Sequence, residues 1–111
     1  KTPGVSFIEA GWLEAVIPET KYDLITAYEV LEHVPLEEVP KWISKMEYYG
    51  KRILISVPDQ DHKLNPQHQW TPSMETIAPL FQRKKNFQID YCTYPLNKSI
   101  PNNWFIRYDT N

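Results

Sequence analysis

The run from Tyr22 to Tyr28 is almost continuously apolar, and it limits the folds open to this chain. Its β-branched and aromatic members favour a strand, and a strand that is apolar on both sides is typical of a parallel sheet covered on both faces. Arg52 to Val57 forms a second such run, closed by Pro58. Between them, residues 36–49 carry apolar side chains at helical spacing, namely Val39, Trp42, Ile43, Met46 and Tyr49. We therefore predict a strand–helix–strand unit, in which Gly50 ends the helix in a left-handed conformation.

The rest of the chain extends this unit on both sides. The residue pattern predicts a short strand at 5–8, a turn of helix at 12–17, a helix at 73–82 and two alternating strands at 87–94 and 103–108. In the second helix, we expect Ile77, Leu80 and Phe81 to point inward. Residues 59–72 form a long polar loop, and the turn-rich residues 95–102 suit a hairpin connection. The predicted fold class is α/β, with one domain over residues 1–111 and a reversed terminal strand pair.

The charge balance gives no indication of a nucleic-acid partner or of an anionic membrane. The chain has 12 basic and 14 acidic side chains, so its formal net charge is -2. That balance provides no electrostatic footprint for nucleic acid or for an anionic membrane, and the one basic cluster, Arg83 to Lys85, is typical of a solvated helix end. Cys92 is the single cysteine, which excludes an internal disulfide and indicates an inert, half-buried thiol in a reducing compartment. We expect a cytoplasmic protein that does not cross a membrane.

Residues 22–34 read Tyr-Asp-Leu-Ile-Thr-Ala-Tyr-Glu-Val-Leu-Glu-His-Val. This stretch resembles the fourth-strand motif of class I, S-adenosylmethionine-dependent methyltransferases, and the similarity continues in order along the chain. The helix of residues 36–49, Gly50 and the strand ending at Pro58 resemble the family's next helix, glycine turn and fifth strand. The resemblance implies methyl transfer from S-adenosylmethionine to an acceptor that the sequence does not identify.

Two later segments extend the same resemblance. His68 to Pro72 is similar to the family's entry into the following helix, and Phe87 to Ile89 is similar to its sixth strand, with Asn86 where glycine is usual. Residues 5–8 would then be the third strand. The resemblance therefore implies a partial Rossmann-like methyltransferase sheet that holds family strands three to seven.

The glycine-rich part of this family is missing from the sequence. The chain has three glycines and no Gly-x-Gly word, so the turn that lets backbone approach the cofactor is absent. We expect the chain to be a fragment of a larger methyltransferase that binds the cofactor weakly or not at all by itself. The alternative is a non-catalytic remnant that binds a partner. In either case the strand at 22–28 has an open edge, which a second copy, giving a dimer, or another chain would cover.

The resemblance also indicates which residues would form the site. Glu29 would line the methionine end of the cofactor or the substrate mouth, while Glu9 or Trp12 would replace the acidic group that accepts from the adenine amine. His33 would act as a general base for a small-molecule hydroxyl or amine acceptor, because imidazole titrates near neutral pH; the alternative is that it only shapes the turn into the helix. His68 would lie on the substrate side. For Glu32 we favour a role in shaping the turn that follows the strand.

The loop at 59–72 contains a second group of candidate ligands. His62 and His68, together with Asp59 and Asp61, suggest a metal-dependent hydrolase, but their spacing matches no metal-ligand motif. We therefore predict solvated loop residues and no metal site. Trp70 and Trp104 are predicted to anchor the core.

Overall fold

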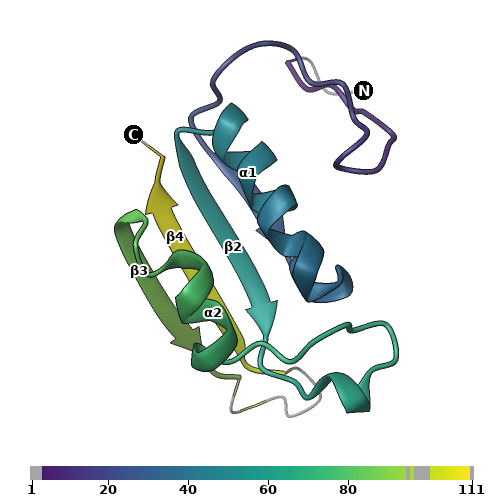
Figure 1. Ribbon diagram of the computed structural model, residues 1–111, viewed down its shortest axis with the longest axis vertical. Coiled ribbons are helices and arrows are strands. Elements are labelled where there is room, and N and C mark those ends of the chain that lie inside the picture. Colours follow the sequence, from purple (N-terminus) through teal and green to yellow (C-terminus); the bar gives the residue numbers. More distant parts are fainter. Residues whose placement is uncertain (1–3, 95, 97–100, 111) are drawn as a thin grey trace.

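Four strands form one mixed sheet in the order β1-β2-β4-β3 (Figure 1). The structure is a computed structural model, and it describes residues 4–94, 96 and 101–110. β1 (Ile25–Tyr28) and β2 (Arg52–Pro58) are parallel, whereas β4 (Asn103–Asp109) is antiparallel to both β2 and β3 (Lys85–Cys92). The α/β class and the antiparallel terminal pair are confirmed. The reversed strand, β4, lies inside the sheet, and β3 forms one edge.

Both helices lie on the same face of the sheet (Figure 1). α1 (Val39–Tyr49) connects β1 to β2, and α2 (Met74–Phe81) connects β2 to β3. Three short 3-10 turns lie in the connections: η1 (Leu31–His33), η2 (Leu36–Glu38) and η3 (His62–Leu64). Alternate side chains of β2 and β4 meet the apolar faces of both helices in one core, which includes Val39, Ile43, Met46, Ile53, Ile55, Val57, Ile77, Phe81, Ile106 and Tyr108.

The opposite face of the sheet carries no helix within the described residues. The prediction that the first strand is covered on both faces is therefore wrong for this chain, since Leu24 is 48% exposed and Tyr28 is 56% exposed. The reason is that α1 and α2 occupy the same side. β1 is also shorter than predicted: it begins at Ile25, while Tyr22 makes only an isolated bridge to Gly50.

The strand expected at Val5 to Ile8 does not form. These residues have no regular structure, and Phe7 is 82% exposed. A strand needs a neighbour for its backbone hydrogen bonds, and within the described residues β1 pairs only with β2. The turn expected at 12–17 is present as one hydrogen-bonded turn, in which the Ala15 amide donates to the Gly11 carbonyl at 2.9 Å.

Gly50 follows α1 in an extended conformation, with φ of -118°, so the predicted left-handed cap is wrong. Its role is close packing. A Cβ atom at Gly50 would lie 3.0 Å from side-chain carbons of both Ile25 and Ile53. The missing side chain thus lets the turn after α1 pass directly over the start of β1 and β2.

The second half of the chain has two well-defined local features, at the start of α2 and at the start of β3. Ser73 caps α2 and forms a reciprocal capping box with Thr76. Asn86 has a φ of +54°, the left-handed conformation that favours glycine or asparagine, at the position where the family resemblance expects glycine. A bulge in the β3–β4 pairing lies at this point.

Three other expectations meet different outcomes. Cys92 is exposed at the end of β3 instead of half-buried. The hairpin connection at 95–102 falls largely outside the described residues. Within the described part of the chain, no helix has the length and apolar character needed to cross a membrane.

Candidate functional site

A polar cleft of about 400 Å³ lies where the parallel strands β1 and β2 end. Its lining includes Glu29 directly after β1, Gln60 shortly after β2, and His33 and His68 from the two connections. The carboxyl ends of parallel strands share one edge of a sheet, which is where open α/β folds bind ligands. We call this the histidine cleft and define it by Glu29, Glu32, His33, Gln67 and His68.

Glu29 makes the sharp turn out of β1. Its φ of +53° is left-handed, a conformation that costs a non-glycine residue about 1–2 kcal/mol. The turn is held because the Glu29 amide donates to the Ser56 carbonyl of β2 at 2.8 Å. Strained backbone of this kind concentrates at ligand sites. The turn directs the chain into η1, and it leaves the Glu29 side chain at the cleft.

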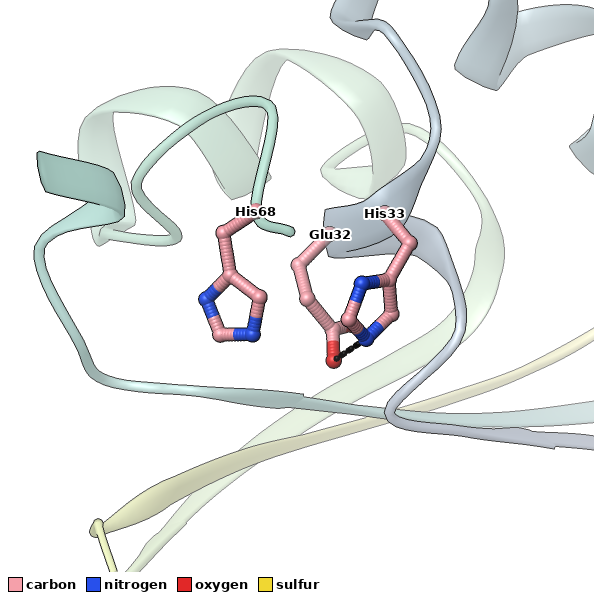
Figure 2. Close-up of side chains that lie close together, drawn as sticks. All are labelled: Glu32, His33 and His68. Atoms are coloured by element: carbon pink, nitrogen blue, oxygen red, sulfur yellow. Dashed lines mark ion pairs between the residues drawn. The ribbon is translucent and has the colours of Figure 1, made fainter. Parts of the chain in front are cut away.

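Glu32 and His33 are neighbours on η1 with opposite environments. Glu32 is buried, with 1% of its surface exposed, whereas the His33 side chain is 39% exposed. Glu32 Oε2 and His33 Nε2 lie 3.5 Å apart, as the dashed line in Figure 2 marks. Burial raises the pKa of the Glu32 carboxyl, although its backbone hydrogen bond and His33 act in the opposite direction.

The loop before α2 brings His68 against η1. Two hydrogen bonds connect these segments: the Trp70 indole donates to the Leu31 carbonyl at 2.9 Å, and the Gln69 amide donates to the Glu32 carbonyl at 2.7 Å. His68 lies between these anchors and Asn65, and it is 8% exposed. Burial lowers the pKa of the His68 imidazole. Trp70 is thus a core anchor, as predicted, and it also positions the site.

The two histidine rings meet edge to face, with centroids 4.9 Å apart and an interplanar angle of 77°. Figure 2 shows them beside the Glu32 carboxylate. His33 Nδ1 lies 3.0 Å from the Gln67 carbonyl, which can only accept, so Nδ1 carries a proton, and Nε2 keeps its lone pair when the ring is neutral. His68 Nε2 faces the Asn65 amide nitrogen at 3.3 Å, and that amide nitrogen can only donate. In the neutral rings both Nε2 atoms are therefore acceptors.

The structure does not bring all the predicted site residues together. Glu29, His33 and His68 line one cleft, but Glu9 is exposed in the irregular segment before the first turn. Trp12 lines an apolar groove of about 210 Å³ between α1 and β1. Its indole donates to the Trp42 carbonyl at 3.2 Å, and the Lys45 ammonium lies 4.9 Å from its ring centre. We call this the edge groove and define it by Trp12, Ile25, Ala27, Trp42 and Met46.

The edge groove and the histidine cleft are neighbours. A shallow apolar depression joins them, because it shares Trp42 with the groove and shares Glu29 and His33 with the cleft. The path follows the carboxyl end of β1.

Sequence reasoning missed the part that Glu32 plays. It was expected only to shape the turn, yet its side chain is buried between the two histidines and belongs to the same cluster. Glu32 and His33 lie directly after the predicted strand, where ligand residues were expected, but nothing in the local sequence marks Glu32 as buried. The contribution of Asn65 and Gln67 had no local signal either, because it depends on how the distant loop folds back.

The loop residues considered as a metal set have separate structural partners. His62 Nδ1 lies 2.7 Å from the Thr71 hydroxyl, Asp61 caps η3 by accepting from the Lys63 amide, and Asp59 accepts from the Tyr91 hydroxyl. His68 alone belongs to the histidine cleft. The loop therefore works mainly as a scaffold for His68.

Comparison with known proteins gives no family assignment. No family model matches the chain, and no curated protein or solved structure matches it either.

Proposed function

We propose that this chain is the acceptor side of a class I, S-adenosylmethionine-dependent methyltransferase domain. One observation carries the proposal: Glu29, His33 and His68, the residues that the family resemblance relates to cofactor and acceptor, meet in one cleft at the carboxyl ends of β1 and β2. They come from two distant segments, so the meeting was not guaranteed by the local sequence. Glu9, which lines neither the cleft nor the edge groove, has no part in the proposal.

The sheet supports the same assignment. The resemblance equates β1 to β4 with family strands four to seven and requires an antiparallel terminal pair, which β3 and β4 form. Asn86 adds a local agreement, since its left-handed backbone suits the glycine that is usual there. These features support the proposal at the level of chain order, independently of the site.

His33 is the proposed proton acceptor. Its Nδ1 proton is held by the Gln67 carbonyl, so the Nε2 lone pair remains for a hydroxyl or ammonium proton of the acceptor. The cofactor, when bound, supplies a methyl group on a sulfonium sulfur. Glu29 provides a carboxylate at the cleft for the cationic methionine end of that cofactor, and Trp12 provides an apolar wall in the adjoining groove. His68, on the far wall, would contact the acceptor.

The test uses the protein encoded by the reading frame that contains this chain. We expect calorimetric titration to show that it binds S-adenosylhomocysteine, whereas the 111-residue chain alone binds weakly or not at all. Transfer of labelled methyl groups to a panel of hydroxyl and amine acceptors should fall by roughly 10²–10⁴-fold in His33→Ala. His62→Ala, in the same loop system but outside the cleft, is the matched control and should leave transfer unchanged. A protein from the whole reading frame that binds no S-adenosylhomocysteine would refute the proposal.

A second candidate, a partner-binding module, rests on the open edge of β1. Within the described residues β1 pairs on one side only, and the apolar edge groove runs beside it. We place a second copy of the chain there, pairing through β1. Light scattering should then show a concentration-dependent dimer that Thr26→Lys, on the exposed face of β1, weakens. A strictly monomeric wild-type chain would remove this candidate and leave the methyltransferase proposal untouched.

A further inference from the structure

We propose that Glu32, His33 and His68 form a binding site for one divalent transition-metal cation of the Zn²⁺ type. Each residue offers one ligand atom, and these atoms lie within 4.8 Å of one another. Two imidazole nitrogens and a carboxylate oxygen suit zinc, cobalt or nickel, whereas calcium and magnesium prefer oxygen ligands. The inference is independent of methyl transfer, because it concerns cation binding by these side chains alone.

The first argument comes from the pair Glu32 and His33. His33 Nδ1 donates to the Gln67 carbonyl, so the neutral ring presents its Nε2 lone pair to Glu32 Oε2, 3.5 Å away. Two ligands held about 2.1 Å from a tetrahedral zinc ion lie roughly 3.4 Å apart. The observed separation therefore matches two neighbouring ligands, and a cation between them would take the place of the proton that otherwise joins the two side chains.

The second argument is the burial of the carboxylate. Glu32 is 1% exposed, and its Oε1 has no hydrogen-bond partner among the residues that the structure describes. A buried carboxylate is normally paired with a cation or fully hydrogen-bonded, because losing its hydration is costly. The described lining of the histidine cleft adds a second carboxylate, Glu29, and contains no lysine or arginine. A bound cation would therefore balance the negative charge of these two carboxylates.

The third argument comes from the hydrogen bonds that hold the ligand side chains in place. A metal-binding histidine commonly donates its other ring proton to a backbone carbonyl, which fixes the ring and its tautomer. His33 does this through Nδ1 and Gln67. The Trp70 and Gln69 hydrogen bonds hold the loop that carries His68 against η1, and they come from segments that also bear the ligands. Figure 2 shows the resulting approach of His68 toward Glu32 and His33 from the opposite segment.

Binding requires a small local movement. The three ligand atoms lie within 4.8 Å of one another, whereas neighbouring ligands of a tetrahedral zinc ion lie roughly 3.4 Å apart. One ring must therefore move by up to about 1.4 Å. His33 is the exposed member and has room to rotate. At His68 Nε2 the cation would take the place of the Asn65 amide hydrogen.

The experiment titrates the chelator-treated chain with Zn²⁺ by calorimetry and with Co²⁺ by visible absorption, whose band intensity reports four-coordinate geometry. We expect one equivalent per chain and a metal-dependent rise in melting temperature. His33→Ala and His68→Ala should each weaken binding at least tenfold, by analogy with the losses that supporting residues cause. His62→Ala is the matched control, since it removes a histidine from the same loop outside the cluster, and it should bind normally.

Glu32→Gln keeps the inference testable if other variants unfold. The amide has the shape of the carboxylate without its charge, so we expect the metal-free variant to be at least as stable as wild type while its metal-induced rise in melting temperature is lost. A site without metal function would show neither the Co²⁺ bands nor this reversal. The proposal is overturned if wild type binds no Zn²⁺, or if His62→Ala weakens binding as much as His68→Ala does.

Experiments can distinguish cation binding by His33 from its proposed role as a proton acceptor. With a cation bound, His33 Nε2 is a ligand and cannot accept a proton from the acceptor. Methyl transfer that persists in chelator and is lost in His33→Ala would support the proton acceptor. Cation binding that is normal in a protein lacking methyl transfer would support the metal site and refute only the proposed function.

Discussion

Replacing Trp70 by phenylalanine tests how the loop that carries His68 is held. The Trp70 indole is 6% exposed and donates at 2.9 Å to the carbonyl of Leu31, which is itself buried. Phenylalanine keeps an aromatic ring in place but has no donor. The buried carbonyl would then keep only its bond from the Val34 amide, at 3.1 Å, and the smaller ring would leave a cavity.

The expected loss has two parts. The Leu31 carbonyl loses one of its two hydrogen bonds, which costs about 0.5–1.5 kcal/mol. Truncating a buried tryptophan to alanine costs about 3–5 kcal/mol, so removing roughly a third of its atoms should cost about 1 kcal/mol. Together these give about 1.5–2.5 kcal/mol out of the 5–15 kcal/mol that is typical of a whole domain, on the order of 6–10 °C in melting temperature.

Trp104→Phe is the matched control. The Trp104 indole nitrogen is buried but finds no acceptor among the described residues, so this substitution removes ring atoms without breaking a hydrogen bond. We expect it to cost only about 1 kcal/mol. Urea unfolding followed by circular dichroism is the suitable assay, because each variant loses a fluorophore. If Trp70→Phe is no more destabilising than Trp104→Phe, the hydrogen bond to Leu31 does not hold this loop.

Three further predictions follow from local contacts. Ser73→Ala removes the side-chain cap of α2 and should lower the free energy of unfolding by about 1 kcal/mol in the same urea assay, whereas Ser73→Asp should not. Gly50→Ala places a Cβ 3.0 Å from Ile25 and Ile53 and should cost about 1–3 kcal/mol by overpacking, a loss that a compensating Ile53→Val, which removes the contacting Cδ1, should reduce. The Asn86 amide and then the Arg52 guanidinium lower the pKa of the Asp109 carboxyl. That stabilisation is present above the ordinary carboxyl pKa and is lost as the pH falls through the lowered one, so Asn86→Gly, which keeps the left-handed backbone, should raise the Asp109 pKa in an NMR titration.

Much of the secondary structure could be predicted because it depends on near neighbours. The apolar period of residues 36–49 marked α1, the spacing of Ile77, Leu80 and Phe81 marked α2, and the β-branched run ending at Pro58 marked β2. In each case, the determining contacts lie within a few positions along the chain.

The predictions that failed depend on distant parts of the chain. The apolar character of residues 22–28 cannot show whether a second layer covers the outer face, and Val5 to Ile8 cannot show whether a partner strand exists. Gly50 looked like a helix cap, but its extended backbone and its contacts with Ile25 and Ile53 show that it serves the packing of two strands. Each of these outcomes depends on which elements meet.

The sequence by itself determined a strand–helix–strand unit, an antiparallel terminal pair and a set of carboxylate and imidazole side chains near strand ends. Only the tertiary structure decided that Glu32 is buried and that His68 reaches His33. The physical reason is that parallel β1 and β2 end at one edge of the sheet, and that a hydrogen bond between Trp70 and Leu31, 39 positions apart, holds the intervening loop there. The residue types determine which functional groups are available, while long-range contacts determine which of these groups meet in one site.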